Sequence, residues 1–190
     1  MVSGALPFIL SSIISIKGLS ALSRDEEKKT DEREGLISLY KSVVDPEWID
    51  YNGHMTESRY LYVFGEASDA MFEFIGMDSE YRERGYSIYT VETHLCHLQE
   101  VGLGQPLAVY TQLLGYDQKR FHLAHWLEGG VRRPLLATAE HMFLHVNTVE
   151  KRSCPMQSPL NDRLAAIWEE HSNLPQPGFA LRSIQKVTPS

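Results

Sequence analysis

After residue 76 the spacing of apolar residues changes from helical to strand-like, and that change limits the folds this chain can adopt. Between residues 60 and 75, apolar side chains recur at helical spacing, at Tyr60, Leu61, Phe64, Ala67, Met71, Phe74 and Ile75. Gly76 follows them and can end a helix. Beyond it, strand-like runs with a period near two occupy residues 86–101, 105–117, 119–130 and 134–152. This order is typical of α+β proteins, in which a helix packs on an antiparallel sheet.

Two flanking segments complete the predicted fold. Residues 36–44 are rich in β-branched and apolar side chains and predict a first strand, which Asp45 and Pro46 close. Residues 160–171 have helical spacing and predict a C-terminal helix on the outside, followed by an extended tail. We therefore expect an α+β domain over residues 36–190, with a curved sheet wrapped around one long central helix. Both faces of the last strand are partly apolar, which favours a helix on one face and another subunit on the other.

The charge and composition of the chain argue against some classes of function. The net charge of -7 argues against a nucleic-acid binder, because such proteins carry a surplus of Lys and Arg. No apolar run reaches the roughly 18 residues of a membrane-spanning helix, so we expect no membrane partner. The two cysteines fit a reducing, cytoplasmic location. Residues 1–35 predict a disordered or targeting-like extension, and the location becomes organellar if residues 1–24 are a targeting segment.

A polar loop, DYNGH at residues 50–54, leads directly into the central helix. Asp50 can cap that helix or pair with its dipole. Alternatively, its carboxylate activates water or attacks an acyl carbon, while N–H groups near Gly53 and His54 hold the developing oxyanion. Gly53 would let a substrate carbonyl approach the main chain. The simpler explanations are that Gly53 only allows a turn and that His54 is structural. Glu57 is either a first-turn acid or a second active-site acid.

The sequence predicts neither a metal site nor a bound cofactor. It contains no HExxH, paired CxxC or acidic calcium loop, and no GxSxG nucleophile elbow. His141 and His145 share one strand face but lie roughly 13 Å apart, too far for one ion. Lys119 and Arg120 stand at the start of a strand, where they are either solvated charge or contacts for a nucleotide phosphate.

The loop and the order of the elements resemble the hotdog-fold acyl-CoA thioesterases of the 4-hydroxybenzoyl-CoA thioesterase-like class. Their catalytic loop has an acid, two variable residues, Gly-His and an aliphatic residue before the central helix, and residues 50–55 here are DYNGHM. The segments EWIDYNGHM, SDAMFEFIGMD, YTVETH, LLGYDQKRFHL and ATAEHMFLHV are similar, more narrowly, to the thioesterases associated with carnitine dehydrogenase, which hydrolyse betainyl-CoA. The resemblance covers about residues 38–185.

The resemblance implies hydrolysis of an acyl-CoA, preferably betainyl-CoA, without a cofactor, since CoA is part of the substrate. It makes Asp50 the catalytic carboxylate, as base or nucleophile, and the turn at Gly53 the oxyanion site. It also implies a homodimer or homotetramer, with Lys119 and Arg120 of a neighbouring chain near the CoA phosphates. Some relatives carry a histidine seven residues after the acid, where this chain has Glu57.

A trimethylammonium group has no N–H to donate and is best held by aromatic faces and diffuse negative charge. The residues proposed to bind the substrate are Trp48, Tyr51, Asn52, Tyr60 and Trp126. The acids available to balance its charge are Glu57, Glu92 and Glu140. For any one of these aromatic residues, a place in the core is the simpler explanation. Two other functions stay open: a hotdog dehydratase or hydratase that acts on the acyl chain, and a non-catalytic acyl-CoA-binding protein.

Overall fold

The computed structural model describes residues 33–182. The chain divides into two units, Met1–Glu34 and Gly35–Ser190, and the fold below is that of the second. The predicted targeting segment at residues 1–24 lies outside the described residues, and the cytoplasmic location stays a prediction. No helix within the described part is long and apolar enough to cross a membrane.

The order of the elements is strand, central helix, four long strands and C-terminal helix, as the sequence predicted. The elements are β1 Ile37–Val43, η1 Pro46–Trp48, α2 Glu57–Ile75, α3 Ser79–Glu83, β2 Tyr86–His97, β3 Pro106–Tyr116, β4 Arg120–Gly129, β5 Leu135–Asn147, β6 Arg152–Ser153 and α4 Leu160–His171. Helix α3 was not predicted. It begins where the side chain of Asp78 accepts a hydrogen bond from the N–H of Tyr81.

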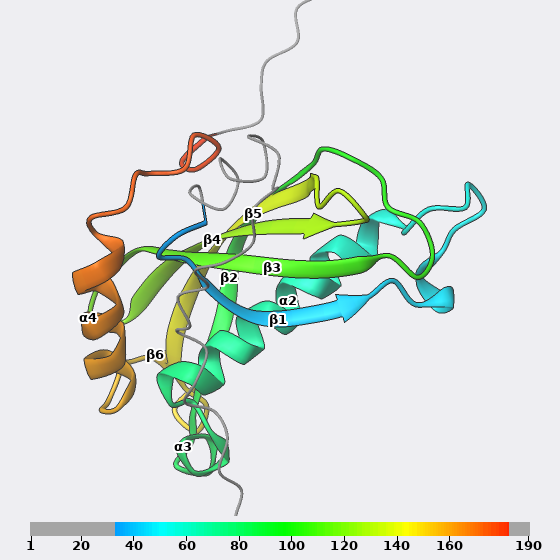
Figure 1. Cartoon of the computed structure of the whole chain (residues 1–190). Helices are drawn as coiled ribbons and strands as arrows, with labels where there is room; N and C mark the ends of the chain where they lie inside the picture. The colour runs from blue at the N-terminus through cyan, green and yellow to red at the C-terminus, as the bar shows by residue number, and fades with distance from the viewer. Residues whose placement is uncertain (1–32, 183–190) are drawn as a thin grey trace, which may run out of the picture. The chain divides into compact units, whose positions relative to one another are not determined.

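The strands form one antiparallel sheet in the order β1-β3-β4-β5-β2, and β6 pairs with β5. Figure 1 shows the sheet curving around α2, which runs along its inner face. The predicted α+β class with a sheet wrapped around a central helix is confirmed. Strands β1 and β2 are the two edges, and β2 is the longer, with Tyr89 and Val91 more than half exposed.

Helix α2 forms because its apolar side chains face the sheet. The residues that it buries are Tyr60, Val63, Phe64, Ala67, Ser68, Met71, Phe72 and Ile75. Gly76 ends the helix in the left-handed region at φ 100°, a conformation that favours glycine. The core has two clusters along the helix. One, with Met55 and Tyr60, lies at its N-terminal end, and the other, with Phe72, lies at its C-terminal end.

The outer face of the sheet is partly covered by the segment after α4. The ring of Phe179 meets Trp126 of β4 edge to face, 5.1 Å between centroids. The N–H of Leu181 donates to the buried carboxylate of Glu140, 2.8 Å away. Residues 178–181 form a turn, so this tail is not extended throughout.

Candidate active site

The loop before α2 is closed by its own hydrogen bonds. The N–H of Asp50 donates to the carbonyl of His54 at 3.0 Å, and the N–H of Gly53 donates to the carbonyl of Asp50 at 3.0 Å. Oδ1 of Asp50 accepts from the N–H of Asn52 at 2.8 Å. Gly53 has φ 81°, which a glycine adopts without strain. The positions of these residues are therefore fixed by a tight turn.

Asp50 does not cap α2. The N-cap of that helix is Thr56, whose N–H donates to the carbonyl of Trp48 at 2.9 Å. The Asp50 side chain is partly exposed, and its Oδ2 has no hydrogen-bond partner among the described residues. One oxygen of the carboxylate thus orders the turn, while the other is open to a water molecule or a substrate.

The main-chain N–H groups of Gly53 and His54 differ in whether they already have an acceptor. The N–H of Gly53 is taken by Asp50, whereas the N–H of His54 has no acceptor among residues 33–182. Apart from its two chain neighbours, no described residue has an atom within 4 Å of the position that a Cβ on Gly53 would occupy, so the main chain is accessible there. The geometry thus leaves the N–H of His54, rather than that of Gly53, as an open donor in the same tight turn as the Asp50 carboxylate.

A second loop, residues 98–104, packs along the first. The N–H of Met55 donates to the carbonyl of Val101 at 2.9 Å, and His54 forms an isolated bridge with Gly102. Oε2 of Glu100 lies 3.3 Å from Nδ1 of His54. Sequence reasoning did not select Glu100, because nothing in its own neighbourhood indicates that the two loops are neighbours.

The proposed substrate-binding residues lie in different environments. Tyr51 is 97% exposed, and Asn52 is also exposed. Trp48 meets Tyr62 edge to face at 5.6 Å. Tyr60 is buried and donates to the carbonyl of Gln99 at 3.1 Å.

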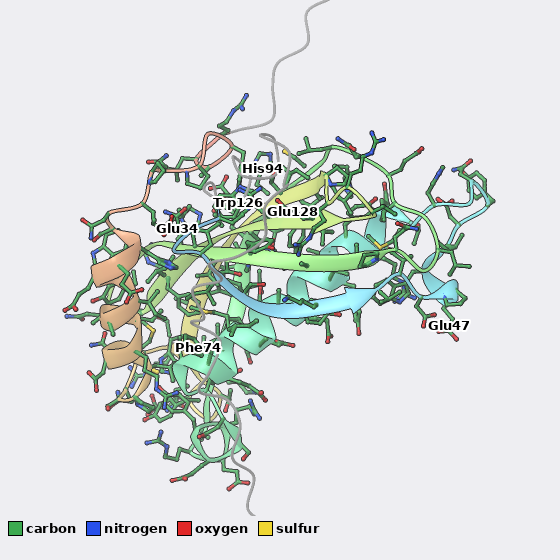
Figure 2. The ribbon with its side chains drawn as sticks, viewed as in Figure 1. Glu34, Glu47, Phe74, His94, Trp126 and Glu128 are labelled. Carbon is green, nitrogen blue, oxygen red and sulfur yellow. The ribbon has the colours of Figure 1, made fainter. Side chains whose placement is uncertain are left out.

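The structure does not bring Trp126 into this group. It lies on the outer face of the sheet, against the tail, whereas α2 covers the inner face. Figure 2 shows Trp126 and His94 well away from Glu47, which marks the end of the sheet near the loop. Of the acids considered, Glu140 lies on this outer face, where its Oε2 is 3.1 Å from Nε2 of His122. Glu57 is the exposed first residue of α2.

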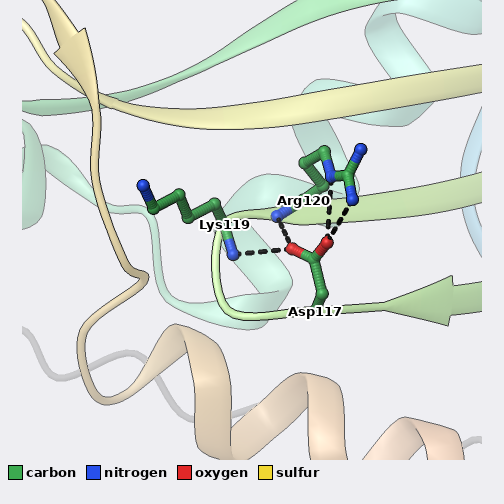
Figure 3. A network of polar contacts seen from close by, with 3 residues as sticks. All are labelled: Asp117, Lys119 and Arg120. Carbon is green, nitrogen blue, oxygen red and sulfur yellow. Dashed lines mark hydrogen bonds and ion pairs between the residues drawn. The ribbon is translucent and has the colours of Figure 1, made fainter.

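The predicted phosphate contacts line a pocket of about 420 Å³ at the turn between β3 and β4. There Asp117 accepts from the N–H groups of Lys119 and Arg120, at 2.8 Å each, and its Oδ2 pairs with the guanidinium of Arg120 at 2.6 Å. These bonds, first that from Lys119, lower the pKa of Asp117. Figure 3 shows the ammonium group of Lys119 pointing away from the carboxylate. Arg120 is therefore paired, while the Lys119 cation has no acidic partner among the described residues.

The loop and this pocket lie at opposite ends of the sheet. Val44, just before the loop, donates to the carbonyl of Gln105 at the start of β3, whereas Lys119 follows the end of that strand. An eleven-residue strand separates them by about 30 Å. Within one chain, the Asp50 carboxylate and Lys119 therefore cannot contact the same small molecule unless that molecule is very extended.

A pair of buried histidines lies between α2 and the sheet. His125 bonds through Nδ1 with Thr111 at 2.9 Å and through Nε2 with Ser68 at 3.3 Å, and its ring centroid is 5.3 Å from that of His141. His141 Nδ1 bonds with Thr93 at 2.9 Å, while its buried Nε2 has no hydrogen-bond partner among residues 33–182. Burial lowers the pKa of His125 well below its usual value and that of His141 to about 4. Both rings are thus neutral at pH 7.

In the described part of the chain, no three His, Cys, Asp or Glu side chains are arranged to hold a metal ion.

The fold and the loop together define a class. The chain belongs to the thioesterase-like superfamily, whose family model matches residues 44–164. The resemblance and the hotdog fold predicted from the sequence are therefore confirmed.

Two relatives show which members of this superfamily the chain is similar to. The chain is 42% identical over 156 residues to the L-carnitine dehydrogenase/betainyl-CoA thioesterase of Rhizobium meliloti, covering 82% of this chain and 32% of that protein. It thus spans about a third of that relative's length. It is 43% identical over 143 residues to the betainyl-CoA thioesterase of Pseudomonas aeruginosa, covering 75% of this chain and 90% of that protein.

Among solved structures, a Staphylococcus aureus protein in complex with CoA superimposes with a TM-score of 0.74 at 25% identity, covering 80% of this chain and 96% of that one.

Proposed function

We propose that this chain hydrolyses betainyl-CoA to betaine and free CoA. The observation that carries the proposal is the loop itself, in which an Asp50 carboxylate with one open oxygen shares a tight turn with the open N–H of His54. The names of the relatives from Rhizobium meliloti and Pseudomonas aeruginosa support betainyl-CoA as the substrate. The CoA complex of the Staphylococcus aureus protein supports a CoA ester as the ligand class.

The chemistry requires one base and one site for negative charge. Asp50 takes a proton from water as the water oxygen bonds to the thioester carbon, and the carbonyl oxygen becomes an oxyanion. The N–H of His54 stabilises that charge. Collapse of the intermediate breaks the C–S bond, and the CoA thiolate leaves and takes up the proton held by Asp50. Direct attack by the carboxylate, followed by hydrolysis of the anhydride, uses the same residue and gives the same products.

The nucleotide end of CoA is assigned to a second chain. Because Lys119 lies about 30 Å along β3 from the loop, we propose that Lys119 and Arg120 of a neighbouring subunit approach the phosphates. Edge strand β2 supports a homodimer, since no described strand pairs with one side of its twelve residues and the side chains of Tyr89 and Val91 are exposed. Assembly of such dimers into a tetramer is compatible with this arrangement.

A thiol-release assay over betainyl-CoA, short-chain, long-chain and aromatic acyl-CoAs tests the substrate. We expect the highest kcat/KM for betainyl-CoA. A betainyl-CoA value no higher than that for acetyl-CoA would refute the substrate assignment. Formation of a double bond without thiol release would indicate a dehydratase instead, and binding of CoA esters without turnover would indicate a binding protein.

A further inference from the structure

Betainyl-CoA requires that its cation be recognised close to the reacting carbon. A single methylene separates the quaternary nitrogen from the thioester carbonyl, so any group that senses the positive charge must stand next to the catalytic loop. The nitrogen carries no N–H, which leaves unpaired carboxylate oxygens and aromatic faces as suitable partners. This inference rests on the proposed function.

Glu100 is the acid whose side chain is tied to that loop. Its Oε2 lies 3.3 Å from Nδ1 of His54, and the carbonyl of His54 accepts from the N–H of Asp50. His54 thus links the two acids: its ring contacts the Glu100 carboxylate, and its carbonyl accepts from the main chain of Asp50, the proposed base. By contrast, Glu140 is held on the outer face of the sheet by His122 and the tail.

The surroundings of Glu100 leave it available to a ligand. Its side chain is 73% exposed, and the contact with His54 engages Oε2 but leaves Oε1 without a partner in the described residues. The main chain beneath it is held by the bond from Met55 to Val101, so the carboxylate stands on an ordered loop. Its charge also acts on the neighbouring ring of Tyr60, where burial first and Glu100 second raise the pKa of the phenol.

We propose that Glu100 is a specificity-determining residue that recognises the quaternary ammonium group of the substrate. The contact of Oε2 with Nδ1 of His54, at 3.3 Å, orients the carboxylate, and Oε1 faces the trimethylammonium group. The attraction distinguishes a cationic acyl group from a neutral one of the same shape. Since the chemistry at the thioester carbon is the same for both, Glu100 does not change the rate for the neutral group.

A matched pair of substrates tests this role. 3,3-Dimethylbutanoyl-CoA has a carbon in place of the quaternary nitrogen and is otherwise the same shape as betainyl-CoA. The variant Glu100→Gln keeps an oxygen acceptor for His54 but removes the charge. We expect it to lower kcat/KM for betainyl-CoA about fivefold to tenfold. For the neutral analogue, kcat/KM should stay within about twofold of the unmutated protein.

The control is Glu80→Gln, which removes the same charge from an exposed residue of α3. It should leave both substrates unaffected, which excludes a general effect of net charge. Thermal unfolding of both variants should match the unmutated protein, because both side chains are exposed.

The possible results distinguish a failure of the role proposed for Glu100 from a failure of the proposed function. An equal loss on both substrates in Glu100→Gln would show that Glu100 only holds the loop, and no loss on either would remove it from the site; each result overturns the inference. If the unmutated protein hydrolyses neither CoA ester, the proposed function itself fails.

Discussion

The N–H of Asp50 donates to the carbonyl of His54 at 3.0 Å, which closes the polar loop in front of α2. The bond joins the proposed base to His54, whose own N–H has no acceptor among the described residues. Gly53 lies between them at φ 81°, and its left-handed conformation allows the turn to close.

Replacing Gly53 by Ala should disturb this turn. No atom would clash with the new methyl group, so the effect comes from forcing a residue with a Cβ to φ 81°. We expect about 1 kcal/mol lower free energy of unfolding and a reduced kcat. Gly115→Ala is the control, since its site in β3 is also open but does not require positive φ. Equal effects of the two substitutions, measured by urea unfolding and thiol release, would contradict the role of the turn.

Lys119→Ala should weaken binding of the nucleotide part of CoA alone. We expect KM for betainyl-CoA to rise about fivefold, corresponding to about 1 kcal/mol for one exposed charge pair. KM for betainyl-pantetheine, which lacks the nucleotide, should not change. Arg120→Ala should have the smaller effect, because its guanidinium is already paired with Asp117 at 2.6 Å. A similar rise of KM for both substrates would rule out a phosphate contact.

The buried histidines should make the fold sensitive to acid. Burial lowers the pKa of His141 from 6.5 to about 4, so the unfolded chain binds the proton more readily than the folded one. The contribution of His141 to the free energy of unfolding is complete above pH 6.5 and falls by about 3 kcal/mol as the pH drops to 4. His141→Leu should remove that part of the decline, as measured by urea unfolding at several pH values. Parallel stability curves for the variant and the unmutated protein would contradict this.

The edge strand β2 should form the interface of the proposed dimer. Val91→Lys places a charge on its exposed side, and we expect sedimentation to show monomers and thiol release to fall, since a second chain is proposed to supply Lys119. Val149→Lys, at a position that is 78% exposed in the turn after β5, is the control and should leave the assembly unchanged. A Val91→Lys variant that still sediments as a dimer would exclude β2 from the interface.

Much of the fold could be predicted because its elements have strong periodic patterns. The C-terminal helix was predicted at residues 160–171 and found at Leu160–His171, since its apolar face packs at the end of the sheet. Helix α3 was missed because five residues with one buried side chain, Tyr81, are too few to establish a period.

The site was less predictable, because contacts between loops are not visible in sequence spacing. The motif identified Asp50, but not that Thr56 is the helix cap. Glu100 was missed, since it reaches His54 only through the pairing of two loops. Trp126 was grouped with Tyr60, although a sheet separates the two side chains.

The most direct measurement is thiol release from betainyl-CoA by the Asp50→Asn variant. Asparagine keeps an oxygen that accepts from the N–H of Asn52, so the turn, the oligomeric state and the unfolding temperature should be preserved. It cannot serve as a base or nucleophile at neutral pH, so kcat should fall at least about 100-fold. Turnover by the folded Asp50→Asn variant at the rate of the unmutated protein would contradict the proposed mechanism.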